Sequence, residues 1–419
     1  MKGIRTRRGL AHAAAGVGLA VAMLVAAAAP AGAETAAWSQ RADGRIWAWG
    51  WNGDGQAGNG TGTNYVAAPT QVPVGTRFTA ISASDFDSAA IDSGGRVWAW
   101  GFNSFGQIGD GTTDQRDSPV QVQLPRDVRI VAIAAGPYDT LAIDSKGRTW
   151  AWGDNNAGEL GIGTASLGSH STTPVLVHTP AGVRFVVLAA SGLNILALDT
   201  QGRAWTWGNN SYGQLGIGTV AAGPNPTPVQ VHMPAGVRFT AISVGYTDEM
   251  ALDTTGRAWA WGDDATGALG DGTTTFDDQA TPVAVHMPAG VRFTAISAGY
   301  LHSMALDSQG RAWAWGNDRL GQLGDASTVQ QVIPTAVHMP KGVRFTEVAA
   351  GYFSSVALDS TGRAWAWGDN SEGEFGDGVI GGSSLTPVAA HMPNGVRFTE
   401  ISAHGRHVLA LSDAINQCW

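Results

Sequence analysis

Residues 362–376 read GRAWAWGDNSEGEFG, and six other segments of the chain repeat this string with small changes. The shared element is G-R-x-W-x-W-G, whose first tryptophan falls at positions 47, 98, 150, 205, 259, 313 and 365. Successive copies are therefore 51 to 55 residues apart. They contain fourteen of the seventeen tryptophans, so the fold must explain why tryptophan recurs at this one place.

Each repeat contains about four short segments with the character of β-strands. In residues 311–315 the two tryptophans alternate with alanines, so the large side chains share one face of an extended strand. Residues 308–310 (SQG) before it are typical of a hairpin turn. A proline-containing alternation such as 227–239 and a short apolar run such as 295–299 complete the unit. No segment has a long helical period, so the sequence predicts an all-β protein.

Seven units of about 50 residues predict a seven-bladed β-propeller of four-stranded blades. Each blade lies between two neighbours, so both of its faces are buried. Indoles of one blade can then pack against alanines of the next, which is more consistent with the alternation than an exposed row of sugar-stacking tryptophans. The predicted repeat cores lie near residues 44–60, 95–111, 147–163, 202–218, 256–272, 310–325 and 362–378.

The repeat resembles that of a known family. The strings GRAWAWGNDRLGQLGD (310–325) and AISAGYLHSMALD (295–307) are similar to the repeat of the regulator of chromosome condensation family. The resemblance covers residues 40–412 and implies a seven-bladed propeller. It implies function less directly, because one fold can carry many activities.

Two terminal segments compete for one place in the ring. Residues 36–44 (AAWSQRADG) and 407–414 (HVLALSDA) both have the pattern of the strand that precedes G-R-x-W. Either could pair with the first repeat and close the ring, and the other would then be an extra edge strand. We favour residues 407–414, because 408–411 match the apolar pattern better.

The N-terminal residues 1–33 have the three parts of a secretory signal peptide. A positive region (2–8) precedes an Ala/Val/Leu-rich stretch, and Ala31-Gly32-Ala33 forms a cleavage site. We therefore expect a cleaved signal peptide followed by a single propeller over residues 34–419. This exported bacterial protein would be secreted or held at the cell surface, without membrane association after cleavage.

The composition limits the classes of partner. The net charge is −9 and only 14% of residues are charged, so the chain cannot neutralise many phosphates and nucleic acid is not an expected partner. Cys418 is the only cysteine, which rules out an intramolecular disulfide.

Aromatic residues recur at the loop ends that follow the short apolar runs. Tyr and Phe are enriched at protein interfaces, so we predict that these residues form a partner-binding face. The set is Phe86, Tyr138, Tyr246, Tyr300, Tyr352 and Phe353.

A polar residue starts the next strand in every copy, close to the aromatic residue where there is one. It has two interpretations: it caps the backbone within each blade, or it forms a polar ring at the mouth of the central channel that binds a cation or a basic group. The family resemblance implies a location near the central opening, where this residue is often histidine. The set is Asp87, Asp139, Asn194, Asp248, His302, Ser354 and His407.

Other repeated polar residues are interpreted as structural. Six Asp/Arg pairs flank the hairpin turns at a spacing that suits ion pairs: 92/96, 144/148, 199/203, 253/257, 307/311 and 359/363. The same interpretation applies to the arginines at 77, 129, 184, 238, 292, 344 and 397. The histidines at 178, 232, 286, 338 and 391 occupy one repeat position, too far apart to share a metal ion.

The sequence contains no motif of a known catalytic or cofactor site. G-x-S-x-G at a helix start, H-E-x-x-H, the P-loop and the D-x-D-x-D-G calcium loop are all missing, so we expect no enzyme activity, metal or cofactor.

These observations predict a monomeric, non-enzymatic scaffold that binds an extracellular or cell-surface protein through one propeller face. One alternative is an inhibitor of an extracellular enzyme such as a β-lactamase, because a secreted bacterial propeller with similar repeats uses loop-end aromatics in this way. A second is a carbohydrate-binding or polysaccharide-active propeller. Guanine nucleotide exchange, the activity of the family's founding member, is not expected outside the cell.

Overall fold

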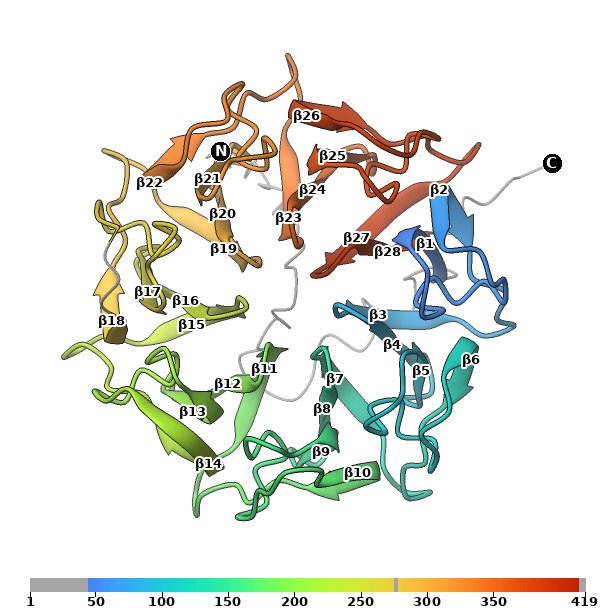
Figure 1. Ribbon diagram of the computed structural model, residues 1–419, viewed down its shortest axis with the longest axis vertical. Coiled ribbons are helices and arrows are strands. Elements are labelled where there is room, and N and C mark those ends of the chain that lie inside the picture. The colour runs from blue at the N-terminus through green and yellow to red at the C-terminus, as the bar shows by residue number, and fades with distance from the viewer. Residues whose placement is uncertain (1–43, 275–277, 414–419) are drawn as a thin grey trace, which may run out of the picture.

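The computed structural model describes residues 44–274 and 278–413. This part of the chain forms seven four-stranded antiparallel sheets around a central axis (Figure 1). The prediction of an all-β, seven-bladed propeller is confirmed. The predicted signal peptide lies outside the described residues, and the described ranges contain no helix able to span a membrane.

Six blades are continuous in sequence, and each is built from the centre outward. Blade 2 contains β3 (Phe78–Ala83), β4 (Asp87–Asp92), β5 (Val97–Gly101) and β6 (Arg116–Gln121). Blade 3 contains β7 (Ile130–Ala135), β8 (Asp139–Asp144), β9 (Thr149–Asp154) and β10 (His170–Leu176). Blade 4 contains β11 (Phe185–Ser191), β12 (Asn194–Asp199), β13 (Ala204–Asn210) and β14 (Ala221–Gln230).

The next three blades repeat this order. Blade 5 contains β15 (Phe239–Val244), β16 (Asp248–Asp253), β17 (Ala258–Gly262) and β18 (Gln279–Ala284). Blade 6 contains β19 (Phe293–Ala298), β20 (His302–Asp307), β21 (Ala312–Gly316) and β22 (Gln331–Ala336). Blade 7 contains β23 (Phe345–Ala350), β24 (Ser354–Asp359), β25 (Ala364–Asp369) and β26 (Ser383–Ala389).

Blade 1 joins the two ends of the chain. Its strand order is β2-β1-β28-β27, from β2 (Tyr65–Gln71) and β1 (Arg45–Trp51) to β28 (His407–Asp413) and β27 (Arg397–Ala403). β28 pairs with β1 in the register Leu409↔Ala48. The favoured closure by the C-terminal segment is therefore confirmed, while all but the last residue of the competing segment 36–44 lies outside the described residues.

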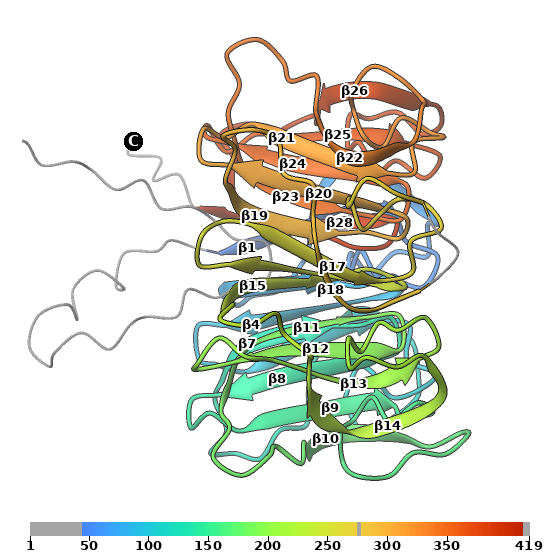
Figure 2. The ribbon, with the colours of Figure 1, turned by 90° about the vertical axis from the view of Figure 1, so that its left-hand side faces the viewer.

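The direction of the strands gives the propeller two distinct ends (Figure 2). The first and third strands of a blade run the same way, so their following loops lie at one end, which we call the loop face. The hairpins between second and third strands and the connections between blades lie at the other end, which we call the hairpin face.

The hairpins are held by a repeated carboxylate. In blade 6, Asp307 accepts hydrogen bonds from Arg311 Nε at 2.6 Å and Trp313 Nε1 at 3.1 Å, and from two backbone amides. Burial acts to raise the pKa of Asp307, but these hydrogen bonds outweigh it and lower the pKa below its ordinary value. The expected Asp/Arg ion pairs are found at 92/96, 144/148, 199/203 and 307/311. At 253/257 and 359/363 the arginine instead donates its backbone amide.

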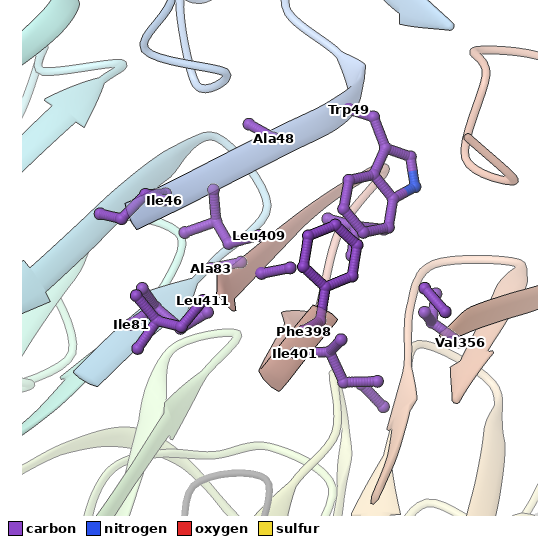
Figure 3. Close-up of a cluster of buried hydrophobic side chains, with 14 of the residues drawn as sticks. Ile46, Ala48, Trp49, Ile81, Ala83, Val356, Phe398, Ile401, Leu409 and Leu411 are labelled. Carbon is purple, nitrogen blue, oxygen red and sulfur yellow. The ribbon is translucent and has the colours of Figure 1, made fainter. Parts of the chain in front are cut away.

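The second tryptophan of each repeat joins neighbouring blades. Trp315 is fully buried, stacks on Phe293 of its own blade at 6.1 Å, and donates Nε1 to the carbonyl of Ala268 in blade 5 at 2.8 Å. It shares a core cluster with Ala258 and Ala260 of blade 5, so the expected packing of indole against alanine is confirmed. Figure 3 shows the corresponding Trp49 and Phe398 in blade 1.

Candidate interaction face

The six predicted partner-binding aromatics all lie on the loop face, in the loops between first and second strands. They are partly exposed, and Tyr246 is the most open of them at 42%. The side chains fall into two groups rather than one continuous ring.

The first group joins blades 2 and 3. Phe86 stacks on Tyr138 with ring centroids 5.7 Å apart. Two further rings, Phe102 and Phe105, contact this pair at 6.0 Å and 5.3 Å. These two residues belong to the loop after the third strand of blade 2. Each position is aromatic in only one other repeat, as Trp51 and Tyr212, so no recurring aromatic pattern singles them out.

The second group crosses blades 5, 6 and 7. Tyr300 lies between Tyr246 at 4.5 Å and Tyr352 at 4.0 Å, and Phe353 meets Tyr352 edge-on at 4.6 Å. The guanidinium of Arg406 lies 4.7 Å from the Tyr352 ring centre. Aromatic stacks of this kind lose little side-chain entropy on binding, so they suit a recognition surface.

A charged pair lies next to the second aromatic group. Arg406 Nη1 lies 2.7 Å from Glu372 Oε1, which belongs to the loop after the third strand of blade 7. Arg406 is exposed on the loop face. The second group therefore combines aromatic rings with an accessible cation, a combination found at interface hot spots.

The seven predicted polar residues, each the first residue of a second strand, are buried, with exposed fractions between 0% and 3%. They do not form an exposed ring at the channel mouth. Where hydrogen-bond partners are present, they lie in the same loop or the next blade: Asp87 binds Ser84, and Asn194 donates to Glu249 of blade 5. Three members of the set, Asn194, His302 and His407, connect neighbouring blades in this way.

Two histidines of this set show how the connection works. His407 Nε2 donates to Ser88 Oγ of blade 2 at 2.8 Å, and Ser88 in turn donates to the carbonyl of Gln56. His302 makes the same contact with Ser355 of blade 7 at 2.9 Å. Burial lowers the pKa of His302 to about 3 and that of His407 to about 4, so both rings are neutral and structural.

Three carboxyls of the set carry a buried oxygen that has no hydrogen-bond partner in the described part of the chain: Asp87 Oδ2, Asp139 Oδ1 and Asp248 Oδ2. Burial raises the pKa of each carboxyl well above its ordinary value. These carboxyls are enclosed between blades, so they do not form an exposed anionic ring that could hold a cation.

The central channel is too narrow for a small-molecule ligand. Small side chains of the innermost strands line it, among them Ser82, Ala134, Ala189, Ser243, Ser297 and Ala349. It leaves about 60 Å³ of space, enough for a few waters but far below the roughly 300–1,000 Å³ of typical ligand pockets. Within the described ranges no group of His, Cys, Asp and Glu could hold a metal ion, and the five repeated histidines are exposed and separate.

His404 lies across the loop-face end of this channel. Its Nδ1 lies 3.2 Å from Asp85 Oδ1 in blade 2, and its Nε2 lies 3.2 Å from the carbonyl of Val244 in blade 5. Both ring nitrogens thus face acceptors, which favours the protonated imidazolium. Desolvation acts to lower the pKa of His404, but the hydrogen bond and charge of Asp85, with the Val244 carbonyl, outweigh it and raise the pKa.

Replacing Asp85 by asparagine is expected to lower the pKa of His404 below that of the wild-type protein, because desolvation remains while the compensating charge is lost. Titration of the imidazole by NMR measures this change. Asp114→Asn, in an exposed loop, serves as the control and should leave the pKa unchanged. An equal His404 pKa in wild type and Asp85→Asn would show that the pair does not form in solution.

These features define a repeat β-propeller whose central channel is too small for a ligand and whose aromatic groups lie on one face. The chain belongs to the RCC1-like domain family, whose model matches residues 16–338 and 111–419. The family assignment suggested by the repeat is therefore confirmed. Proteins of this family act in protein binding and regulation, and the described residues show no positive sign of catalysis.

Several known proteins are similar over most of the chain. The ultraviolet-B receptor UVR8 of Arabidopsis thaliana is 28% identical over 341 residues, which cover 80% of this chain and 75% of UVR8. RUG3, a mitochondrial RCC1 domain-containing protein of the same plant, is 31% identical over 302 residues, or 70% of this chain and 66% of RUG3. The match to the human E3 ubiquitin-protein ligase HERC2, 27% identical, covers 77% of this chain but only 7% of HERC2.

Two solved structures have the same fold. Human WBSCR16 superposes with a TM-score of 0.80 at 18% identity, covering 89% of this chain and 99% of WBSCR16. Yeast RCC1 (Prp20), solved in complex with Kap60, superposes with a TM-score of 0.79 at 20% identity, covering 100% and 97% of the two chains.

Proposed function

We propose that this protein is an exported, non-enzymatic scaffold that binds a secreted or cell-surface protein through its loop face. The observation that carries the proposal is the stack of Tyr246, Tyr300 and Tyr352 with Arg406 beside it, partly exposed on a rigid ring. Export rests on the signal-peptide pattern of residues 1–33. Protein binding by relatives supports the type of partner, since one of them was solved bound to Kap60.

The architecture explains why this face suits protein recognition. Each tyrosine follows the innermost strand of a blade, and the blades are fixed to one another by buried tryptophans. The rings are therefore held in place before a partner arrives, which reduces the entropy lost on binding. The surrounding loops after the third strands differ in length between blades and supply a variable rim.

The test compares capture of partners by the native chain with capture by a triple variant. The chain is immobilised and exposed to secreted and cell-surface proteins of the source organism, and retained proteins are identified by mass spectrometry. Changing Tyr246, Tyr300 and Tyr352 to alanine should remove the specific partner, because truncating an interface hot spot typically costs about 2 kcal/mol or more.

The matched control is Val131→Ala with Leu176→Ala, which shortens exposed apolar side chains on the hairpin face. Thermal unfolding confirms that both variants fold. A partner retained equally by the tyrosine variant and the wild type would contradict the assignment of the face. A chain that stays in the cytoplasm with residues 1–33 intact would contradict export.

A further inference from the structure

The two ends of the propeller carry opposite charge, although the whole chain has a net charge of −9. Among the described Lys and Arg residues, only Arg116, Arg319 and Arg406 lie at the loop face. The remainder lie at the hairpin face, in the hairpins and at the connections between blades. Most acidic side chains that are at least partly exposed, in contrast, lie at the loop face.

One arginine from each blade forms what we call the arginine ring. Each member stands at the start of the innermost strand, on the hairpin face, and each is exposed. The members are Arg77, Arg129, Arg184, Arg238, Arg292, Arg344 and Arg397.

The backbone fixes the members of this ring in place. The carbonyl of Arg238 accepts the amide of Thr254 at 3.2 Å within blade 5, and the next amide, Phe239, donates to Gly202 of blade 4 at 2.9 Å. Gly202 has a positive φ of 71°, and a Cβ there would lie 2.7 Å from the Phe239 carbonyl oxygen. Glycine is thus needed for the close approach that positions the arginine.

The guanidinium groups are oriented as well. Nη1 of Arg129, Arg238 and Arg292 donates to a hairpin carbonyl of the preceding blade, that of Gly94, Gln201 or Thr255. The same contact recurs at three blade interfaces, so it follows from the repeat and not from one chance conformation. Arg129, Arg238 and Arg292 are exposed, so the N–H groups that this contact does not use are available to bind an anion.

The charge of six of the seven ring members is not compensated by an ion pair within the described part of the chain. No carboxylate of the described residues forms an ion pair with Arg129, Arg184, Arg238, Arg292, Arg344 or Arg397. The hairpin arginines differ, because Arg96, Arg148, Arg203 and Arg311 each pair with an aspartate. The ion pairs explain the hairpin arginines as structural residues. They do not explain the exposed charges of the six ring members without an ion pair.

A groove lies beside one member of the ring. It runs between the hairpin 92–95 of blade 2 and residues 129–131 of blade 3, and holds about 320 Å³. The hydroxyl-bearing side chains Thr79, Ser93 and Ser145 line it together with Arg129. The groove is large enough for a sugar ring, and hydroxyls beside a fixed guanidinium offer partners for sugar hydroxyls and an acidic substituent.

We propose that the hairpin face binds a linear acidic polysaccharide, whose carboxylate or sulfate groups contact the arginine ring and one of whose sugars occupies the groove at Arg129. This site is separate from the protein-binding loop face. A lipid surface fits less well, since Val131 and Leu176 are the only large apolar side chains exposed at the hairpin face of the described chain. A nucleic acid duplex fits less well because it is stiff. Its phosphates beyond the arginine ring would be repelled by the net negative charge of the protein.

The test measures binding of the full chain to polygalacturonate and to heparin by titration calorimetry at low and moderate salt, with neutral dextran as the control ligand. The variant R129Q/R238Q removes two ring charges. The matched control, R116Q/R319Q, removes two charges from the loop face. We expect the ring variant to bind about tenfold or more weakly at low salt, with a shallower salt dependence, because fewer counterions are released on binding.

The control variant should bind the anionic polysaccharides as the wild type does, and equal melting temperatures exclude unfolding as the cause. Absence of binding to both polymers would overturn the proposal, as would equal losses in the ring and control variants. Tighter binding to anionic vesicles or duplex DNA than to either polysaccharide would also overturn it, because the occupant would then be of another class.

Discussion

Replacing Trp315 by alanine is expected to lower the free energy of unfolding by about 3–5 kcal/mol, the range found when large aromatic side chains are removed from protein cores. The indole is fully buried and stacks on Phe293. Its removal opens a cavity between blades 5 and 6 and leaves the carbonyl of Ala268 without its indole donor. Urea unfolding followed by circular dichroism measures the loss.

Two further variants separate the contributions. Trp315→Phe keeps a ring in the core but removes the Nε1 donor, so its cost should be smaller than that of alanine. Trp313→Ala truncates the first tryptophan of the same strand, which is only partly buried, and should also cost less. Equal losses at Trp313 and Trp315 would contradict the assignment of the second tryptophan as the residue that joins the blades.

The double variant E159Q/E374Q is expected to be more stable than the wild type at alkaline pH, by about 3 kcal/mol or more at about pH 9. Both carboxyls are buried, and burial raises the pKa of Glu159 to about 7 and that of Glu374 to about 8. Four other repeats carry glutamine at this position: Gln56, Gln107, Gln214 and Gln322. Glutamine is therefore compatible with the local structure.

The sign of this effect follows from the direction of the shifts. A carboxyl with a raised pKa in the folded state binds its proton more tightly there than in the unfolded chain. Its favourable contribution is complete below the ordinary pKa of 4.5 and is lost as the pH rises through about 7 for Glu159 and about 8 for Glu374. The wild type should therefore lose stability over this range, and the double variant should lose less.

The hydrogen bonds around Glu159 are compatible with its replacement by glutamine. Its Oε2 accepts the amide of Ala157 at 2.9 Å, as the glutamine oxygens do in other repeats, but its Oε1 is buried without a partner among the described residues. An amide in its place can donate, as Gln107 does to the carbonyl of Pro137.

The measurement is the unfolding free energy across the pH range for wild type and variant. The reverse exchange, Gln107→Glu, should introduce the same loss at alkaline pH into another blade. If the wild type and E159Q/E374Q had identical pH profiles, the raised pKa values would be contradicted.

The loop-face site was only partly predictable from the sequence. The aromatics at 86, 138, 246, 300, 352 and 353 stand out because they recur at two adjacent repeat positions. Phe102 and Phe105 each have an aromatic counterpart in only one other repeat, and Arg406 has no arginine counterpart, so no repeat pattern selects them. They enter the site through contacts between loops. The polar residues beside the aromatics recur as well, but whether they face the channel or the next blade depends on how the blades are tilted.

The sequence by itself determined the number of blades, the strand pattern within each and the structural role of tryptophan. These are local properties, since a period of two and a repeat of 51 to 55 residues can be read along the chain. The tertiary structure alone decided that His404 meets Asp85, 319 positions away, and Val244 on the opposite side of the ring. It also decided that the arginines of the arginine ring, which occupy the same position in each repeat, lie together on the hairpin face. Closing the ring creates both arrangements, because closure fixes which residues of different blades become neighbours.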